Sequence, residues 1–166
     1  MTDAGVSISV DAHSVDDAIR RLSPFISFDP SGLMEEIAAL GERQTRRRIA
    51  DEKTAPDGTP WKANWAGTPT LTQTGQHLLQ SVASYATAEE AVWGASWEYA
   101  HVHQEGMVIT PKNGQALKFW FVRGGFVEFV VAKSVTIPAR PFVGLSTENR
   151  TDIEDLISDH FGRLMQ

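Results

Sequence analysis

The sequence predicts an α+β fold: an antiparallel sheet of about four strands, with a long N-terminal helix and a C-terminal helix packed on it. Two stretches with helical periodicity, one after Asp29 and one after Ser146, and a hairpin pattern around Gly124-Gly125 predict this arrangement. Because the chain has 166 residues, residues 1–166 are expected to form a single domain.

The composition is ordinary for a soluble globular protein and excludes several kinds of site. The chain has 42% hydrophobic and 22% charged residues, no cysteine and a net charge of −6. Without cysteine there is no disulfide and no thiolate zinc site, and the negative charge argues against bulk binding to nucleic acid. The sequence has no apolar run of about 18 residues and no basic start typical of a secretory signal, so no membrane contact is expected and a cytosolic location is the simplest interpretation.

The N-terminal part is expected to contain one strand and two helices. Residues 6–10 alternate between apolar and polar side chains, which is typical of a half-buried strand. A short helix over 15–22 follows and is expected to end at Pro24. Asp29 is a good N-cap for the longest helix, over about 30–51, whose first position is a proline.

One side of this long helix is apolar, and three consecutive arginines lie near its end. Arg46 and Arg47 point away from the apolar side, whereas Arg48 projects into it. Because a charge there needs a partner, Arg48 is expected to pair with a carboxylate, with Asp57 as the candidate. The residues on the apolar side are Leu33, Met34, Ile37, Ala38, Leu40, Gly41, Thr45 and Ile49.

Residues 53–70 have the glycine and proline content of a loop and carry two tryptophans, Trp61 and Trp65. Exposing two indole rings to water is unfavourable, so either they fold back on the core or they meet a partner. The elements expected after the loop are a helix over 75–81 capped by Thr74, strands over 82–87 and 91–97, and a helix over 97–104 stopped by Gly106.

The clearest hairpin joins residues 117–123 to 126–131. Gly124-Gly125 supplies the positive φ angles that a two-residue hairpin turn requires. Both arms are apolar on both faces in places, which predicts a sheet covered by helices on one side and by another subunit on the other.

The stretch from Val135 to Ser146 is expected to run from the end of a strand, through a stiff extended arm, to the N-cap of the last helix. Pro138 and Pro141 restrict their own φ and that of their neighbours, and Phe142 is the apolar anchor after them. The last helix has an apolar stripe and an acidic side; the stripe is Ile153, Leu156, Ile157, Phe161 and Leu164, with His160 inside it, and the acidic side is Asp152, Asp155 and Asp159.

Arg140 lies between the two prolines, and two roles are open for it. Its guanidinium is either presented to a partner for bidentate contact or used locally to tie down the C-terminal helix.

His101 and His103, with Glu105, form the only cluster of metal-ligand residue types. Residues two apart share a face on a strand but not on a helix, and a zinc site needs about three protein ligands. The expectation is therefore a hydrogen-bonded histidine pair near a helix end, with no metal and no cofactor. The sequence also has no nucleophile elbow and no phosphate-binding loop, so no enzyme activity is expected.

Four segments resemble the phage virion morphogenesis family, the Mu-like tail-completion proteins. The four occur in the family's order and spacing over nearly the whole chain. They are Ile137-Pro138-Ala139-Arg140-Pro141-Phe142-Val143-Gly144, Pro56-Asp57-Gly58-Thr59-Pro60-Trp61, Leu71-Thr72-Gln73-Thr74-Gly75-Gln76-His77-Leu78 and Tyr99-Ala100-His101-Val102-His103-Gln104-Glu105-Gly106.

The resemblance implies a structural protein at the head–tail junction of a tailed phage. Such a protein completes or caps the tail and joins it to the neck, generally as a ring, for which a hexamer is the candidate. The implied partners are copies of itself, the tail tube or terminator, and head–neck connector proteins. The implied location is the neck or tail end of the virion, after assembly in the host cytoplasm.

The residues that make these contacts are hypotheses. The basic run 43–47, which includes Arg46 and Arg47, is expected to face the acidic residues Asp152, Asp155 and Asp159 of a neighbouring subunit. Trp61, Trp65 and Arg140 are the other candidate contacts. Two alternatives remain, which are a DNA-contacting neck factor that uses the arginine run 46–48 and a small metal-dependent enzyme that uses the histidine pair.

Overall fold

The chain contains both helices and antiparallel strands, which confirms the α+β class. The structure is a computed structural model that describes residues 12–72 and 77–165. The strand expected over 6–10 and the cap expected at Thr74 lie outside the described residues. The helices are α1 (Ala12–Ile26), α2 (Ser31–Arg47) with the π-helical turn η1 (Arg48–Glu52), α3 (His77–Gln80), α4 (Ala100–Glu105) and α5 (Thr147–Leu164).

The strands form three antiparallel pairs rather than one larger sheet. They are β1 (Val82–Ala86), β2 (Ala91–Ala95), β3 (Met107–Ile109), β4 (Leu117–Arg123), β5 (Phe126–Ala132) and β6 (Val135–Ile137). β1 pairs with β2, β3 with β6, and β4 with β5. A two-stranded ribbon is marginal in water by itself, so each pair depends on the elements that cover it.

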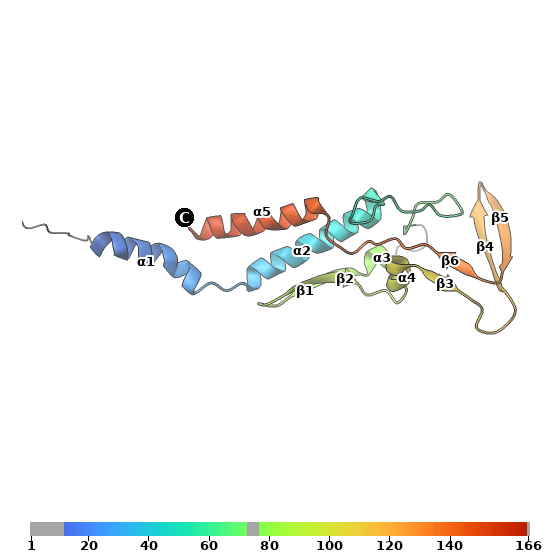
Figure 1. The fold of residues 1–166 in the computed structure, drawn as a ribbon, viewed down its shortest axis with the longest axis horizontal. Coiled ribbons are helices and arrows are strands. Elements are labelled where there is room, and N and C mark those ends of the chain that lie inside the picture. Colours follow the sequence, from blue (N-terminus) through green and yellow to red (C-terminus); the bar gives the residue numbers. More distant parts are fainter. Residues whose placement is uncertain (1–11, 73–76, 166) are drawn as a thin grey trace, which may run out of the picture.

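Two helices and the β1–β2 pair form a layered body, in which α2 lies between α5 and the strands (Figure 1). Most of the apolar side predicted for α2 is buried, including Leu33, Ile37 and Ala38. At Gly41 the ring of Trp93 packs directly on the helix, and a Cβ there would lie 2.3 Å from it. The C-terminal helix packs on α2 rather than on a sheet, so its expected place on the sheet was wrong.

The hydrophobic core lies where the loop, the arm and the ends of the helices meet. Its buried members come from segments far apart in the sequence, and Phe142 from the arm is only 1% exposed. The core residues are Ile49, Trp61, Leu78, Val82, Ala100 and Phe142.

The start of α5 agrees with its predicted cap, whereas the start of α2 is one residue later than predicted. Ser146 caps α5, and its hydroxyl accepts from the Asn149 backbone N–H at 3.1 Å, while the Asn149 side chain returns to the Ser146 backbone. The helix α2 begins at Ser31 with Pro30 as its N-cap, so Asp29 was wrong as the N-cap residue, although its carboxylate accepts from the Ser31 backbone N–H at 3.0 Å.

Pro24 does not end the first helix, contrary to expectation, because α1 continues to Ile26. A proline inside a helix leaves the carbonyl four residues earlier without its usual donor. Here that carbonyl belongs to Arg20, and the Ser23 hydroxyl donates to it at 2.8 Å. The replaced hydrogen bond explains how the helix tolerates the proline.

Gly106 ends α4 as predicted, with φ of 76°. A Cβ at this position would lie 2.7 Å from the Ala139 backbone nitrogen, so glycine also permits the close approach of the arm. The strand β3 follows at once and pairs with β6. It was not predicted, because three residues are too few to show a periodic pattern.

The molecule is long, with α1 at one end and the β4–β5 pair, here called the distal ribbon, at the other (Figure 1). Among the helices within residues 12–72 and 77–165, none is both long and apolar enough to cross a membrane.

Candidate functional site

The double-proline arm is fastened to its surroundings by backbone hydrogen bonds. The Arg140 backbone N–H donates to the His103 carbonyl at 2.7 Å. The Gln104 side chain accepts from the Phe142 and Val143 backbone N–H groups at 3.0 and 3.1 Å. Together these bonds connect the arm to α4, directly before the start of α5; the stiffness predicted from Pro138 and Pro141 stays a prediction.

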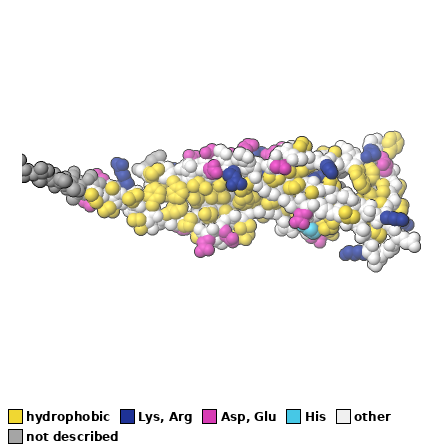
Figure 2. Space-filling view, in the orientation of Figure 1, with side chains coloured by type: hydrophobic (Ala, Val, Ile, Leu, Met, Phe, Trp, Pro, Cys, Tyr) yellow, Lys and Arg dark blue, Asp and Glu magenta, His cyan; other side chains and the backbone are white. Residues whose placement is uncertain are grey.

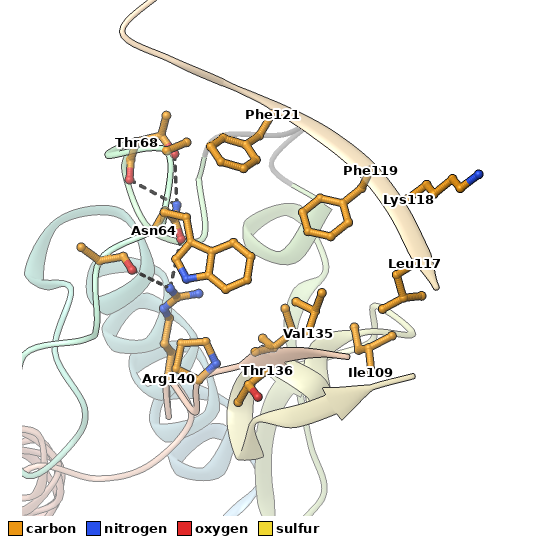
Figure 3. A pocket seen from close by; sticks show the side chains of 15 residues that line it. Asn64, Thr68, Ile109, Leu117, Lys118, Phe119, Phe121, Val135, Thr136 and Arg140 are labelled. Carbon is orange, nitrogen blue, oxygen red and sulfur yellow. Dashed lines mark hydrogen bonds between the residues drawn. The ribbon is translucent and has the colours of Figure 1, made fainter. Parts of the chain in front are cut away.

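The Arg140 guanidinium is buried and is used within the chain. Its Nε and Nη2 donate to the Lys62 carbonyl at 3.0 and 2.8 Å, and Nη2 donates to Asn64 Oδ1 at 3.0 Å (Figure 3). Burial lowers the pKa of Arg140 below its ordinary value. The structure therefore shows a local role, although it ties down the tryptophan loop rather than the C-terminal helix. A contact of Arg140 with a partner stays a prediction, and its 5% exposure leaves little surface for one.

The two tryptophans of the loop take different positions. Trp61 is in the core, and its indole N–H donates to the Pro141 carbonyl at 3.1 Å. Trp65 is 53% exposed and stacks on Phe119 of the distal ribbon with 6.4 Å between ring centroids. The Arg123 guanidinium also donates to the Trp65 carbonyl, so the distal ribbon contacts the loop through both a ring and a hydrogen-bonding side chain.

A groove of about 450 Å³ opens between the loop and the inner face of the distal ribbon. Figure 3 shows Phe119 and Phe121 pointing into it, while Lys118 points away. The strands β3 and β6 form its floor through Ile109, Val135 and Thr136. The groove is mostly apolar, so it suits an apolar side chain from a partner better than a charged ligand.

The outer face of the distal ribbon is apolar and exposed. Cross-strand pairing places Trp120 opposite Phe129 and Val122 opposite Val127, with Val131 further along β5. Trp120 is 63% exposed and Phe129 is 82% exposed. No helix among the described residues covers this ribbon, so the expected helical cover was wrong; cover by another subunit stays a prediction. Large exposed apolar patches mark interaction sites.

Arg46 and Arg47, which were predicted to meet a neighbouring subunit, both have partners within the chain. Arg46 pairs with Glu42 at 2.9 Å and donates to the backbone carbonyls of Leu79 and Val82. Arg47 is more exposed and pairs with Glu52 at 2.7 Å and Glu148 at 3.5 Å.

The acidic residues predicted to face the arginines lie along α5. The Asp152 carboxylate accepts from Gln44 Nε2 at 2.9 Å, within the same subunit. Asp155 is exposed, as is Asp159. The contact between these residues and the arginines of a neighbour stays a prediction.

Arg48 is buried, but its partner is not Asp57, so that pairing was wrong. The Arg48 guanidinium donates to the Phe142 and Gly144 carbonyls at 3.1 and 2.9 Å and to Asn149 Oδ1. The Asp57 carboxylate instead accepts from the Thr59 backbone N–H at 2.9 Å, inside its own turn. The sequence analysis did not identify Asn149 as a partner of Arg48. The two residues are 101 positions apart, and nothing in the sequence around Asn149 indicates this contact.

The histidine pair does not converge on a common site. Both residues lie on α4, where His101 is exposed and His103 is half-buried against Trp97, 5.7 Å away between ring centroids. Within the described part of the chain, no group of three or more histidine, aspartate or glutamate side chains is placed to hold a metal ion. His103 Nδ1 is buried and has no hydrogen-bond partner among these residues.

The stability of the subunit is expected to fall in mild acid because of His103. Burial, and secondarily the charge of Arg140, lowers the pKa of His103 below its ordinary value of 6.5. As the pH falls below that value, the unfolded chain binds a proton that the folded state binds less readily. The stabilising effect of neutral His103 is complete above the ordinary value and is lost as the pH falls through the folded pKa.

The urea midpoint measured between about pH 8 and pH 5 is therefore expected to change less for His103→Gln than for the unsubstituted protein. The control is His101→Gln, at an exposed position on the same helix, and an equal slope for both variants would contradict the prediction.

Comparison with known proteins gives one match. The sequence model of the phage virion morphogenesis family matches residues 10–162. No curated protein and no solved structure matches the chain. The matched range contains the arm, the tryptophan loop, the groove and the distal ribbon.

Proposed function

Because the chain belongs to the phage virion morphogenesis family, its role is in virion assembly, and we propose that it acts at the head–tail junction. In this proposal it is a structural component that completes or caps the tail and joins it to the neck. The observation that carries the proposal is the exposed apolar face of the distal ribbon, because a surface of this kind is typical of a protein that binds other proteins.

The partners proposed are copies of the same chain and the proteins at the end of the tail and in the neck. A ring requires a heterologous interface, in which one surface of a subunit contacts a different surface of the next. The long shape of the subunit, with its two ends exposed, suits such an interface (Figure 1). The groove beside Trp65 offers a second apolar surface, for a side chain of a tail or neck protein.

A DNA-contacting role has less support than a protein-contacting one. The net charge is −6, and two of the three consecutive arginines donate to backbone carbonyls of their own subunit. Arg47 is the exposed member, and it has two carboxylate partners. Binding to duplex DNA that weakens steeply with salt would be needed to favour this alternative.

The proposed function is tested by joining tails to heads in a mixture. Tails assembled without this protein are mixed with filled heads, with and without the purified chain, and joined particles are counted by electron microscopy and plaque titre. Joined particles are expected only when the protein is present. The mass of the pure protein, measured by light scattering, is expected to be a multiple of the subunit mass.

The matched control for this assay changes the order of mixing. The protein is first incubated with heads and the tails are added afterwards, or it is first incubated with tails and the heads are added afterwards. If the protein completes tails, pre-incubation with tails is expected to give more joined particles than pre-incubation with heads. Equal joining in the absence of the protein would overturn the proposed function.

A further inference from the structure

We infer that the first helix of one copy docks on the outer face of the distal ribbon of the next copy, so that α1 and the β4–β5 pair form the repeated contact of the assembly. The inference rests on the proposed function, since it supplies the heterologous interface that a ring needs. It commits to a second copy of this chain as the partner.

The first helix carries an apolar stripe that the described part of its own subunit leaves uncovered. Val15, Ile19, Leu22 and Ile26 follow one another at spacings of four, three and four residues, so they lie on one face. Their exposed fractions run from 48% at Val15 to 84% at Ile26. The helix is attached near its C-terminal end, where Phe25 stacks on Phe161 of α5 with 6.0 Å between ring centroids. The stripe is therefore held in place and available for a partner.

The distal ribbon presents the complementary surface. Trp120, Val122, Val127, Phe129 and Val131 share its outer face, and each is more than 40% exposed. Figure 1 places α1 and this ribbon at opposite ends of the molecule, and Figure 2 shows hydrophobic side chains at both ends. Because the two surfaces lie at opposite ends, they cannot contact each other within one subunit. The stripe of one copy can instead contact the ribbon of the next copy.

The dimensions of the two surfaces agree. From Val15 to Ile26 the stripe runs about 17 Å along the helix axis. From Val127 to Val131 the ribbon face runs about 13 Å along the strand. A helix is about 10–12 Å wide with its side chains, which is enough to cover two strands about 5 Å apart.

Charges beside the two surfaces favour one orientation. Asp16 lies beside the N-terminal half of the stripe, whereas Asp17 lies on the opposite side of α1 and pairs with Arg20 at 3.0 Å. Lys118 lies on the outer face at the open end of the ribbon. Pairing Asp16 with Lys118 places Val15 near Val131 and Ile26 near Val127, at the turn.

The apolar area available is sufficient for a specific contact. Together the exposed parts of these nine side chains amount to on the order of 1,000 Å², compared with the roughly 1,200–2,000 Å² that specific interfaces bury in total. The polar residues beside both surfaces would add the remainder. In a ring each subunit makes this contact twice, once through its helix and once through its ribbon.

The test uses the absence of cysteine from the chain, because each introduced cysteine is then the only one. Two singly substituted proteins are mixed, oxidised and separated on a non-reducing gel. The pairs Val15→Cys with Val131→Cys and Ile26→Cys with Val127→Cys are expected to form dimers at least 10-fold faster than the crossed pair Val15→Cys with Val127→Cys. Val15→Cys with Ser158→Cys, an exposed position on α5, gives the rate of random collision.

A second measurement does not depend on cross-linking. Ile19→Asp and Phe129→Asp are each expected to weaken assembly by about 30-fold, the change expected at a hot spot of an interface. Tyr85→Asp is the matched control, because Tyr85 is also an exposed aromatic residue, 60% exposed, but lies on β1. Circular dichroism verifies that all three variants remain folded.

The outcomes separate this inference from the proposed function. If a ring forms and joins tails to heads, but the matched pairs cross-link no faster than the collision control, the inferred contact is overturned and the proposed function stands. If the matched pairs cross-link while tails and heads join without the protein, the contact stands and the proposed function fails. Faster cross-linking of the crossed pair would overturn the inferred orientation.

Discussion

Replacing Phe142 with alanine is expected to lower the free energy of unfolding by about 3–5 kcal/mol. Phe142 is 1% exposed, and it is the residue of the arm that packs in the core cluster with Ile49 and Trp61. Removing the ring leaves a cavity at the junction of the arm, the loop and η1. Because domains of this size are stable by only about 5–15 kcal/mol, the loss is a large fraction of the total.

Urea unfolding measured by tryptophan fluorescence tests this prediction, since Trp61 lies in the same cluster. The control is Phe126→Ala, at a position 78% exposed on the distal ribbon, where a change within about 0.5 kcal/mol is expected. If both variants lose the same stability, the arm is not the anchor that its burial indicates.

Elements with a local signal were predicted well. Gly124-Gly125 makes the hairpin turn, with φ of 57° and 86°, and the strands on either side pair in the expected register. The cap at Ser146 and the helix stop at Gly106 also depend on chemistry within a few residues. In each case the residue type determines a dihedral angle or supplies a hydrogen bond close by.

Features that depend on distant segments were predicted poorly. The number of strands in a sheet depends on which edges meet. β3 pairs with β6 across 26 positions at Ile109 and Val135, although the sequence indicated only the end of a strand at Val135 and nothing at Ile109. The continuation of α1 through Pro24 required the Ser23 hydroxyl, a detail that the general rule for proline omits.

The candidate site was predicted in part. The exposed ribbon follows from strands that are apolar on both faces, and the sequence indicated a partner surface there. The groove did not follow, because it needs the tryptophan loop to reach the ribbon, and the position of Trp65 against Phe119 is a tertiary contact. Arg48 was correctly predicted to project into the apolar side of the helix. Arg46 and Arg47 were both predicted to point away from it, but Arg46 is half-buried and only Arg47 is exposed.

Replacing Arg48 with methionine is expected to cost about 3 kcal/mol or more, because it leaves buried acceptors without their donor. The guanidinium is 1% exposed and connects η1 to the carbonyls of Phe142 and Gly144 and to the side chain of Asn149. The nearest carboxylate, that of Glu52, lies 3.7 Å from Nε, so the backbone and amide oxygens provide most of the stabilisation of the charge. The arm and the start of α5 would both lose their attachment to η1.

Arg47→Met is the matched control, because it removes the adjacent arginine from exposed ion pairs that are worth at most about 1 kcal/mol. Thermal and urea unfolding of both variants give the comparison. A double-mutant cycle with Asn149→Ala separates the side-chain pair from the backbone contacts, and a coupling energy above about 0.5 kcal/mol is expected for residues that touch. If Arg48→Met costs no more than Arg47→Met, the arm is held by its prolines and by Phe142 without the buried arginine.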